Sequence, residues 1–268
     1  MSVVPLAEAR DETEFGGKAV QLGAALRAGL PVPPGMALAA ALVKAVAEGD
    51  PAATAELEAV AACVAWPVAV RSSAVGEDSA EASFAGQHLT RLNVRDPARL
   101  AEAVAAVWAS AHSDTAFAYR ARLGIVGHPR TGVVVQRLLD PEIAGVLFTR
   151  NPLNGADERM VEASWGLGEA VVAGRVIPDR FRISRDGTVL ERSPGWKQVA
   201  LRQSLDGGTV EEPVAPGCTE KLCLDDRQLA ELHGLATRCE ESFGAGRDLE
   251  WAFADQTLYL LQCRAVTR

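Results

Sequence analysis

The end of the chain constrains the fold most strongly, because two neighbouring segments there alternate between polar and apolar side chains. In DLEWAFA, residues 248–254, large apolar side chains take every second position, so Asp248 and Glu250 face the other side. The following segment, LYLLQCR, carries Gln262 and Arg264 two positions apart. Two such segments joined by a short polar stretch predict a β-hairpin with one polar face.

The register of this hairpin decides which polar side chains meet. Glu250 lies directly opposite Gln262 if Ala254 pairs with Leu258, which leaves residues 255–257 as the loop. A two-residue loop shifts the pairing by one residue and turns Gln262 to the opposite face. We therefore predict a three-residue loop and a polar patch to which both strands contribute.

The composition of this patch is typical of a metal–phosphate site. Glu250 and Gln262 offer oxygen ligands, which suit Mg²⁺, an ion that commonly takes one or two protein ligands together with phosphate oxygens. Arg264 beside them is placed to neutralise a phosphoryl group during transfer. The alternative is a solvated strand face on which Asp248 pairs with Arg264.

A second candidate anion site lies near the N-terminus, in the sequence FGGK (residues 15–18). Two glycines precede a predicted helix over residues 18–28, and Lys18 is its first residue. Backbone N–H groups at a helix start, together with an ammonium group, attract anions. The spacing is not that of a Walker A motif. A glycine turn before a surface helix is the alternative interpretation.

A third candidate is the arginine that ends a short apolar strand predicted over residues 67–71. The guanidinium group of Arg71 can grip phosphate oxygens through two donors at once. The stretch 72–90 that follows is rich in Ser, Gly and Ala, so its backbone amides can approach a polyphosphate closely. The alternative is a polar connection in which Arg71 pairs with Glu77 or Asp78.

The bulk composition limits the class of protein. The chain has 268 residues, 48% of them hydrophobic, which suits one large domain or two lobes. Its net charge of −8 argues against a nucleic-acid binder. The sequence has neither a signal peptide nor an apolar stretch of membrane-spanning length. Five scattered cysteines without a CxxC pair fit a reducing cytoplasm.

Helix and strand patterns predict an α+β fold with mostly antiparallel sheets. Beyond the first helix, helices are expected to begin at Asp96-Pro97, where Asp caps and Pro takes the first position, and to cover residues 226–243, with Asp225 as the cap. Strands predominate after residue 132, and two of them are expected to form a hairpin around Asp140-Pro141-Glu142. We expect an N-terminal lobe over residues 1–130 and a C-terminal lobe over residues 131–268.

Six collinear sequence words resemble the N-terminal nucleotide-binding domain of the phosphoenolpyruvate synthase and pyruvate phosphate dikinase family, which includes rifampicin phosphotransferase. The words are FGGKAVQLGAALRAGLPVPPG, VAVRSSAVGEDSAEASFAGQ, VVVQRLL, AGVLFTRNP, EASWGLGEAVVAGRVIPDR and DLEWAF…LYLLQCR. They span residues 15–264. The resemblance implies a two-lobed ATP-grasp-like fold that holds ATP between its lobes, and an ATP-dependent phosphotransferase activity.

The resemblance also implies the residues of the nucleotide site. Lys18, Arg71 and Arg264 would bind phosphates and act in catalysis, and Glu250 and Gln262 would hold Mg²⁺. The remaining contacts would come from a phosphate-covering loop and from a strand that lines the adenine pocket; these are Gly86, Thr90 and Gln136.

The family's histidine acceptor has no counterpart in this sequence. None of the four histidines lies in the glycine-rich setting of the family's phospho-accepting histidine. The leading hypothesis is therefore transfer from Mg-ATP to a histidine on a separate swivelling protein. A free-standing small-molecule kinase and a non-catalytic ATP-binding sensor or scaffold are the two alternatives.

Overall fold

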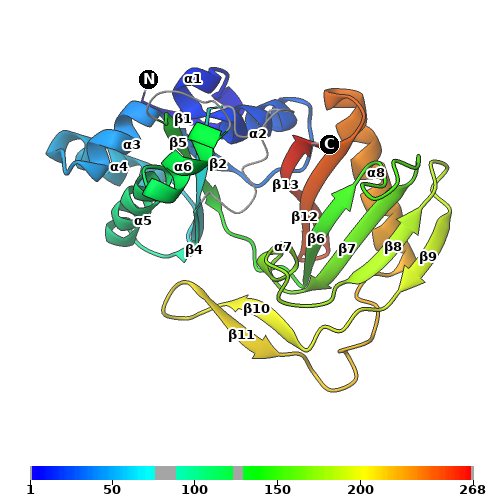
Figure 1. The fold of residues 1–268 in the computed structure, drawn as a ribbon. Coiled ribbons are helices and arrows are strands. Elements are labelled where there is room, and N and C mark those ends of the chain that lie inside the picture. Colours follow the sequence, from blue (N-terminus) through cyan, green and yellow to red (C-terminus); the bar gives the residue numbers. More distant parts are fainter. Residues whose placement is uncertain (1, 76–88, 123–128, 267–268) are drawn as a thin grey trace.

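The computed structural model describes residues 2–75, 89–122 and 129–266, and it is an α+β fold built around two large antiparallel sheets (Figure 1). We call the five-stranded sheet, in the order β1–β2–β5–β3–β4, and its helices the first lobe. Its strands are β1 (Val3–Pro5), β2 (Gly35–Leu38), β3 (Val68–Ala74), β4 (Thr90–Val94) and β5 (Thr131–Arg137). Its helices are η1 (Leu6–Glu8), α1 (Glu12–Phe15), α2 (Gly17–Arg27), α3 (Ala40–Ala47), α4 (Pro51–Cys63), α5 (Pro97–Ala111) and α6 (Asp114–Arg122).

The second lobe is the six-stranded sheet β13–β12–β6–β7–β8–β9 with its helices. Its strands are β6 (Ile143–Phe148), β7 (Arg159–Trp165), β8 (Asp179–Ile183), β9 (Val189–Ser193), β12 (Arg247–Ala254) and β13 (Thr257–Ala265). Its helices are α7 (Glu169–Val172) and α8 (Asp226–Phe243). A separate two-stranded ribbon consists of β10 (Val199–Gln203) and β11 (Thr209–Pro213).

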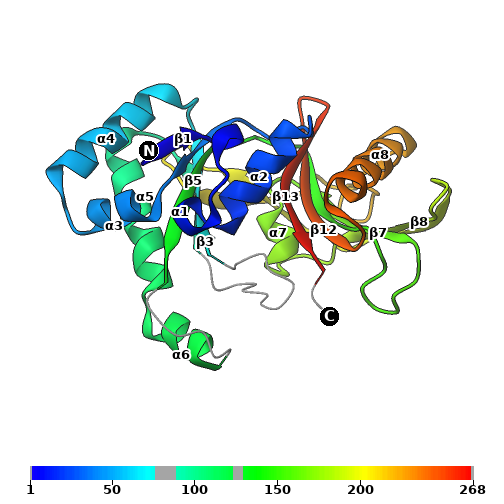
Figure 2. The ribbon, with the colours of Figure 1, turned by 90° about the horizontal axis from the view of Figure 1, so that it is seen from above.

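The two faces of the first sheet have different partners. Val70, Val133 and Val135 point to one face and pack with α3, α4 and α5 in one apolar core. Arg71 and Gln136 alternate with these valines and therefore point to the other face. That face is turned toward α2, which lies between the two sheets (Figure 2).

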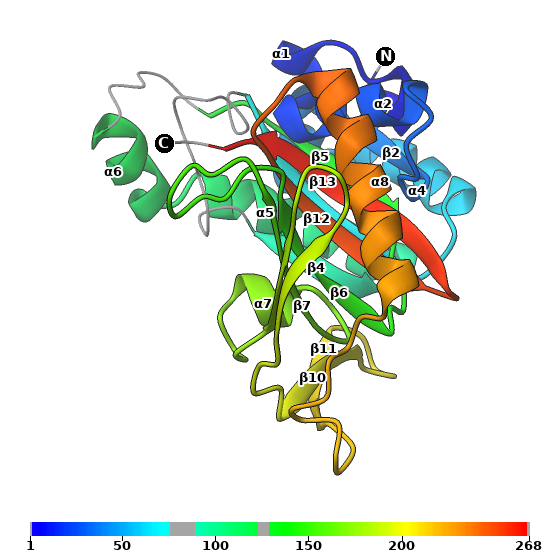
Figure 3. The same ribbon diagram turned by 90° about the vertical axis from the view of Figure 1, so that its right-hand side faces the viewer.

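The second sheet buries its apolar face under one long helix. Leu249, Trp251 and Phe253 of β12 pack in the same core as Leu229 and Leu232 of α8, and Figure 3 shows α8 lying across this face. The same core includes residues of α2, so it runs from one lobe into the other. Since side chains alternate along a strand, the polar residues of β12 point away from α8.

A strap formed by β10 and β11 (residues 199–213) links the lobes a second time and lies below both of them in Figure 1. At the end of β10 nearest its tip, Gln203 donates to the carbonyl of Leu139, at 2.9 Å, in the segment that connects the lobes. At its tip, the Asn93 amide at the end of β4 donates to the carbonyls of Ser204 and Gly208, both at 2.7 Å. The strap therefore fastens the second lobe to β4 of the first.

Removing the side chain of Asn93 should release this tip. Asn93 is buried and adopts a left-handed backbone conformation, φ 57°, that alanine tolerates less well. We expect Asn93→Ala to lower the free energy of unfolding by about 2 kcal/mol, because two carbonyls each lose one of their donors and the left-handed backbone becomes strained. Urea denaturation measures the loss. Asn154→Ala, at an exposed loop asparagine, is the matched control, and equal midpoints for the two variants would contradict the prediction.

The hairpin predicted around residues 140–142 is wrong, because this segment crosses between the lobes. β5 pairs with β2 and β3, whereas β6 pairs with β7 and β12. The backbone N–H of Leu138 donates to Pro67 in the first lobe, and that of Glu142 donates to Phe253 in the second. Two strands on either side of a short turn thus find their partners in different sheets.

The point at which the chain changes sheets lies later than residue 130. β5 follows the boundary expected from the sequence, yet it lies in the middle of the first sheet. The chain passes from one sheet to the other between Arg137 and Ile143.

The helix boundaries that the sequence predicts from capping residues are confirmed. The Asp96 carboxylate accepts from the backbone N–H of Arg99, and α5 begins at Pro97. Asp225 and Gln228 form a reciprocal capping box at the start of α8. Among the described residues, no helix combines the length and the hydropathy that a bilayer crossing requires.

Candidate functional site

Four side chains predicted to share a site meet where α2 and β3 face the C-terminal hairpin. Lys18 extends from the first turn of α2, and its Nζ donates to Oε1 of Gln262 at 2.9 Å. Arg71, on β3, donates through Nη2 to Oε2 of Glu250 at 3.0 Å and to the same Gln262 oxygen at 3.2 Å. Cations from the first lobe and oxygen donors from the second thus form one cluster.

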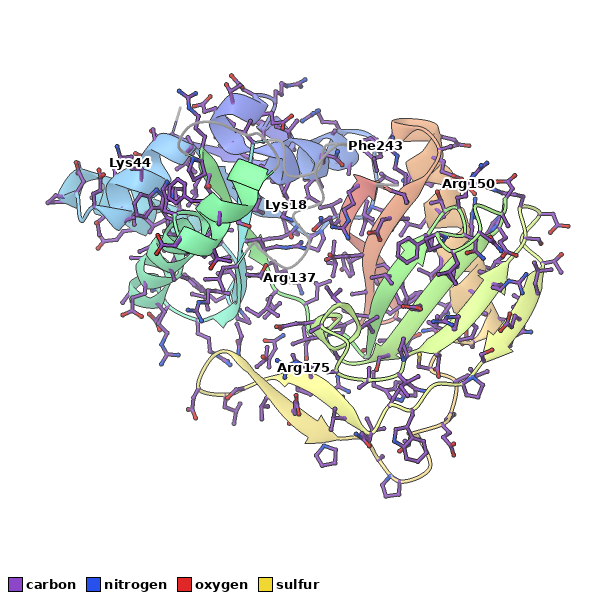
Figure 4. All side chains as sticks on the ribbon, viewed as in Figure 1. Lys18, Lys44, Arg137, Arg150, Arg175 and Phe243 are labelled. Atoms are coloured by element: carbon purple, nitrogen blue, oxygen red, sulfur yellow. The ribbon has the colours of Figure 1, made fainter. Side chains whose placement is uncertain are left out.

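The position of Lys18 is visible in Figure 4. Lys18 lies on the side of the first lobe that is turned toward β12 and β13, whereas Lys44 lies on its far side. Lys18 is also buried, with 6% of its surface exposed. A lysine is rarely buried unless its charge is compensated. The hydrogen bond to Gln262 and the carboxylate of Glu250, opposite Gln262, therefore help to stabilise Lys18 in this position.

The register of the hairpin agrees with the prediction at the site but not at the turn. Glu250 pairs with Gln262, as predicted. The turn, however, has two residues, Asp255 and Gln256, both with positive φ, and Ala254 pairs with Thr257. The predicted three-residue loop is therefore wrong. A β-bulge restores the register: Trp251 pairs with Leu260 and Glu250 with Gln262, which leaves Leu261 as the extra residue.

The bulge also supplies a ligand for the central arginine. Leu261 has no partner on β12, and its carbonyl oxygen accepts a hydrogen bond from Nη1 of Arg71 at 2.7 Å. Both terminal nitrogens of the guanidinium group are therefore engaged by the hairpin. The side chain of Arg71 is 12% exposed, so it is held with little freedom. No pattern of residue types predicts this contact, because a backbone carbonyl is present at every position.

Arg264 and Asp248 form a second ion pair on the same face of the hairpin. Nε and Nη2 of Arg264 lie 2.8 Å and 2.7 Å from Oδ2 of Asp248. Burial raises the pKa of Asp248, and the charge of Arg264 opposes this shift. The Asp248–Arg264 pair, which belongs to the alternative interpretation of this strand face, is thus present. It places Arg264 beside the cluster.

The first glycine of FGGK is explained by close packing. Gly16 has φ 80°, and a Cβ on it would lie 1.8 Å from the carbonyl oxygen of Ser73. The backbone N–H of Ala19, in the first turn of α2, donates to Oγ of Ser73 at 2.9 Å. At least one of the N–H groups predicted to attract an anion is therefore satisfied within the protein.

The other predicted nucleotide contacts lie at varying distances from the cluster. Thr90 is exposed and pairs with Arg71 across β3 and β4. Gln136 shares the sheet face of Arg71, but its side chain is buried and donates to the carbonyl of Pro33 at 2.8 Å. Gly86 lies outside the described residues. The predicted phosphate loop also begins later than expected, because β3 continues to Ala74.

The cluster has the donor types that a magnesium–phosphate complex requires. Glu250 and Gln262 lie opposite each other and direct oxygens to the same point, where Arg71 contacts both. In the part of the chain that the structure describes, no group of three or more His, Cys, Asp or Glu side chains could hold a metal ion. Two protein oxygens, from Glu250 and Gln262, suit an ion that completes its shell with ligand oxygens.

Residues 51–268 match the family described as the pyruvate phosphate dikinase AMP/ATP-binding domain. The chain is 34% identical over 300 aligned residues to a probable phosphoenolpyruvate synthase of Methanothermobacter thermautotrophicus, covering 94% of this chain and 44% of that protein. It is 41% identical over 201 residues to a rifampicin phosphotransferase of Streptomyces sviceus, covering 74% of this chain and 23% of that protein. A probable phosphoenolpyruvate synthase of Pyrococcus abyssi is 40% identical over 213 residues, covering 75% and 26%. The chain thus spans less than half of the length of each of these relatives.

Proposed function

The chain belongs to the pyruvate phosphate dikinase AMP/ATP-binding domain family, and we propose that it binds Mg-ATP between its lobes and transfers a phosphoryl group to a histidine on a separate protein domain. The observation that carries this proposal is the meeting of Lys18 and Arg71 with Glu250 and Gln262. Lys18 and Arg71 come from the first half of the chain, and Glu250 and Gln262 come from its last hairpin. The two cations match the phosphates of a metal–triphosphate, and the two oxygen donors match its metal ion.

The three cations take the phosphates. Arg71 offers a planar fork to two oxygens, and Lys18 offers a point charge beside it. Arg264, 33% exposed on the same face, is the least enclosed of the three. Each contacts acceptors of the hairpin in this structure, so phosphate oxygens would exchange for protein oxygens with little loss of hydrogen bonds.

The metal would be held by Glu250 and Gln262. Two protein oxygens and a set of phosphate oxygens suit Mg²⁺, which would supply charge neutralisation at the transferring group. The residues of this chain orient the triphosphate so that the reacting bond points toward the acceptor. Such positioning accounts for most of the catalysis of phosphoryl transfer.

The base and the loop contacts complete the proposal. Gln136 lies on the same face of the first sheet as Arg71. Because its side chain donates to the Pro33 carbonyl, it would shape the adenine end of the site. Thr90, directly beside Arg71, would close the phosphate end together with Gly86. The division of the chain into two lobes around the nucleotide is part of the same proposal.

The acceptor is proposed to be a histidine outside this chain. His88, His112, His128 and His233 all lack the glycine-rich setting of a phospho-accepting histidine. Transfer of the β-phosphoryl group to such a histidine breaks the bond between the α- and β-phosphates and leaves AMP. The γ-phosphate leaves as inorganic phosphate after water attacks the remaining anhydride. We place the protein in the cytoplasm, where its five free cysteines persist.

A product assay tests this function. The full chain is mixed with Mg²⁺, β-labelled ATP and a histidine-bearing swivel domain from a phosphoenolpyruvate synthase. We expect AMP to form and the label to appear on the swivel domain. Glu250→Gln, which removes the carboxylate charge from the metal pair, should reduce the rate at least a hundredfold.

The same assay separates the alternatives. ADP formed without the swivel domain, in the presence of a pool of small metabolites, would point to a small-molecule kinase. Tight ATP binding with neither AMP nor ADP formed would point to a sensor or scaffold. Either result would overturn the proposed transfer to histidine.

A further inference from the structure

Lys18 and Arg71 belong to different elements, yet their terminal nitrogens share one acceptor. Oε1 of Gln262 lies 2.9 Å from Nζ of Lys18 and 3.2 Å from Nη2 of Arg71. Lys18 extends from the start of α2 and Arg71 from the middle of β3. The spacing of the two cations therefore depends on where α2 sits on β3.

One hydrogen bond fixes that position directly. Ser73 lies two residues after Arg71 on the same face of β3, and its Oγ accepts from the backbone N–H of Ala19 at 2.9 Å. Ala19 is the residue next to Lys18, and both Ser73 and Ala19 are fully buried. A single side-chain atom thus ties the backbone that carries one cation to the strand that carries the other.

The surrounding glycines permit this contact without replacing it. Gly132 pairs with Ser73 across β5, and a Cβ there would lie 2.4 Å from the carbonyl oxygen of Phe15. Together with Gly16, it lets the chain before α2 lie against the sheet. Close backbone approach has no preferred direction along the strand, whereas the hydrogen bond to Ser73 does.

We propose that Ser73 is a positioning residue for the proposed reaction: its hydroxyl fixes Lys18 at the spacing from Arg71 at which both cations grip one triphosphate. The inference rests on the proposed function, because it concerns how the same site is assembled. Ser73 itself contacts neither phosphate nor metal in this assignment. It acts through the start of α2.

The neighbouring residue provides a matched control. Ser72 is on the same strand and equally buried, but it points to the opposite face. Its Oγ has no hydrogen-bond partner among the described residues. Replacing Ser72 with alanine therefore removes an unpaired hydroxyl, which should leave stability unchanged or raise it.

The experiment measures the dissociation constant of Mg-ATP for the full chain by titration calorimetry. Ser73→Ala should raise this constant about tenfold, the effect of losing one ordering hydrogen bond. Ser72→Ala should leave it within about twofold of the unaltered protein. Equal constants for the two variants would overturn the proposal.

A double-mutant cycle separates positioning from a general structural role. If Ser73 acts through Lys18, Ser73→Ala in a Lys18→Met background should change the dissociation constant by less than about twofold. An undiminished tenfold loss in that background would overturn the proposal. If Ser73→Ala does not fold, Ser73→Cys takes its place, because it keeps the size of the side chain but replaces the hydroxyl oxygen with a much weaker acceptor. Unchanged affinity of the cysteine variant would then refute the role.

Failure of the proposed function has a different signature. If the unaltered chain binds no Mg-ATP, the function and this inference fall together. If the unaltered chain binds it and Ser73→Ala binds it equally well, the function stands and only the positioning role falls.

Discussion

Replacing Arg71 with lysine should weaken the binding of Mg-ATP by roughly a hundredfold and slow transfer by more than that. The guanidinium group contacts Glu250, Leu261 and Gln262 through two terminal nitrogens. An ammonium group keeps the charge but loses the planar fork, so it cannot span two phosphate oxygens while facing the hairpin. Because the charge is unchanged, the loss reports geometry, and calorimetric titration together with the product assay measures it.

Arg175→Lys is the control for this experiment. Arg175 also forms an ion pair, with Glu211 at 2.6 Å, but both side chains are 47% exposed. Figure 4 shows Arg175 beside the strap, away from Lys18. Its replacement should leave ATP affinity unchanged. An Arg71→Lys variant that binds Mg-ATP as well as the Arg175→Lys variant would remove Arg71 from the site.

The parts of the fold that are determined locally could be predicted from the sequence. Asp96-Pro97 and Asp225 mark helix starts because their side chains bond to N–H groups only a few residues away. The alternation in β12 predicts which side chains face α8, since successive side chains of a strand must point to opposite sides. Such signals do not depend on which strands become neighbours.

Features that depend on residues distant in the sequence could not be predicted. Asp140-Pro141-Glu142 has the composition of a hairpin turn, yet the strands on either side of it belong to different sheets. Nothing within those few residues records that β3 and β12 offer better partners than the adjacent strand. Strand pairing is decided by burial across the whole domain, which short patterns do not contain.

The hairpin at the C-terminus shows how a correct contact can follow from an incorrect turn. We predicted that Glu250 faces Gln262 by assuming a three-residue loop. The chain instead uses a two-residue turn at Asp255-Gln256 and absorbs the extra residue at Leu261. Neither turn residue is glycine, although both have positive φ, so the usual signature of this turn is missing. The functional face was predictable because both strands alternate; the bulge was not.

The start of α2 illustrates a different limit. FGGK has the features of an anion site, and its lysine does reach the cluster. Its first glycine, however, is required by the close approach of Gly16 to Ser73. Sequence composition alone does not distinguish a glycine that lets a ligand approach from one that lets another strand approach.

Replacing Lys197 with methionine should cause the largest loss of stability of any substitution considered, about 3–5 kcal/mol. Lys197 and Asp179 form an ion pair in which neither side chain is exposed. The Asp179 carboxylate also accepts from the backbone N–H groups of Gly195, at 2.7 Å, and Cys223, at 2.8 Å. Without the ammonium group, a carboxylate remains buried with two neutral donors, and its charge is no longer compensated.

Arg175→Met is the matched comparison, because it breaks an exposed pair and should cost no more than about 1 kcal/mol. Urea denaturation of the two variants measures the difference, and similar midpoints would show that the buried charge is compensated in another way. The loss should appear in stability and not in nucleotide affinity. β8, which carries Asp179, is separated from β13 by β12, β6 and β7. Folded Lys197→Met protein should therefore bind Mg-ATP with the affinity of the unaltered chain. This result would separate the residues that stabilise the second lobe from the residues that bind the phosphates.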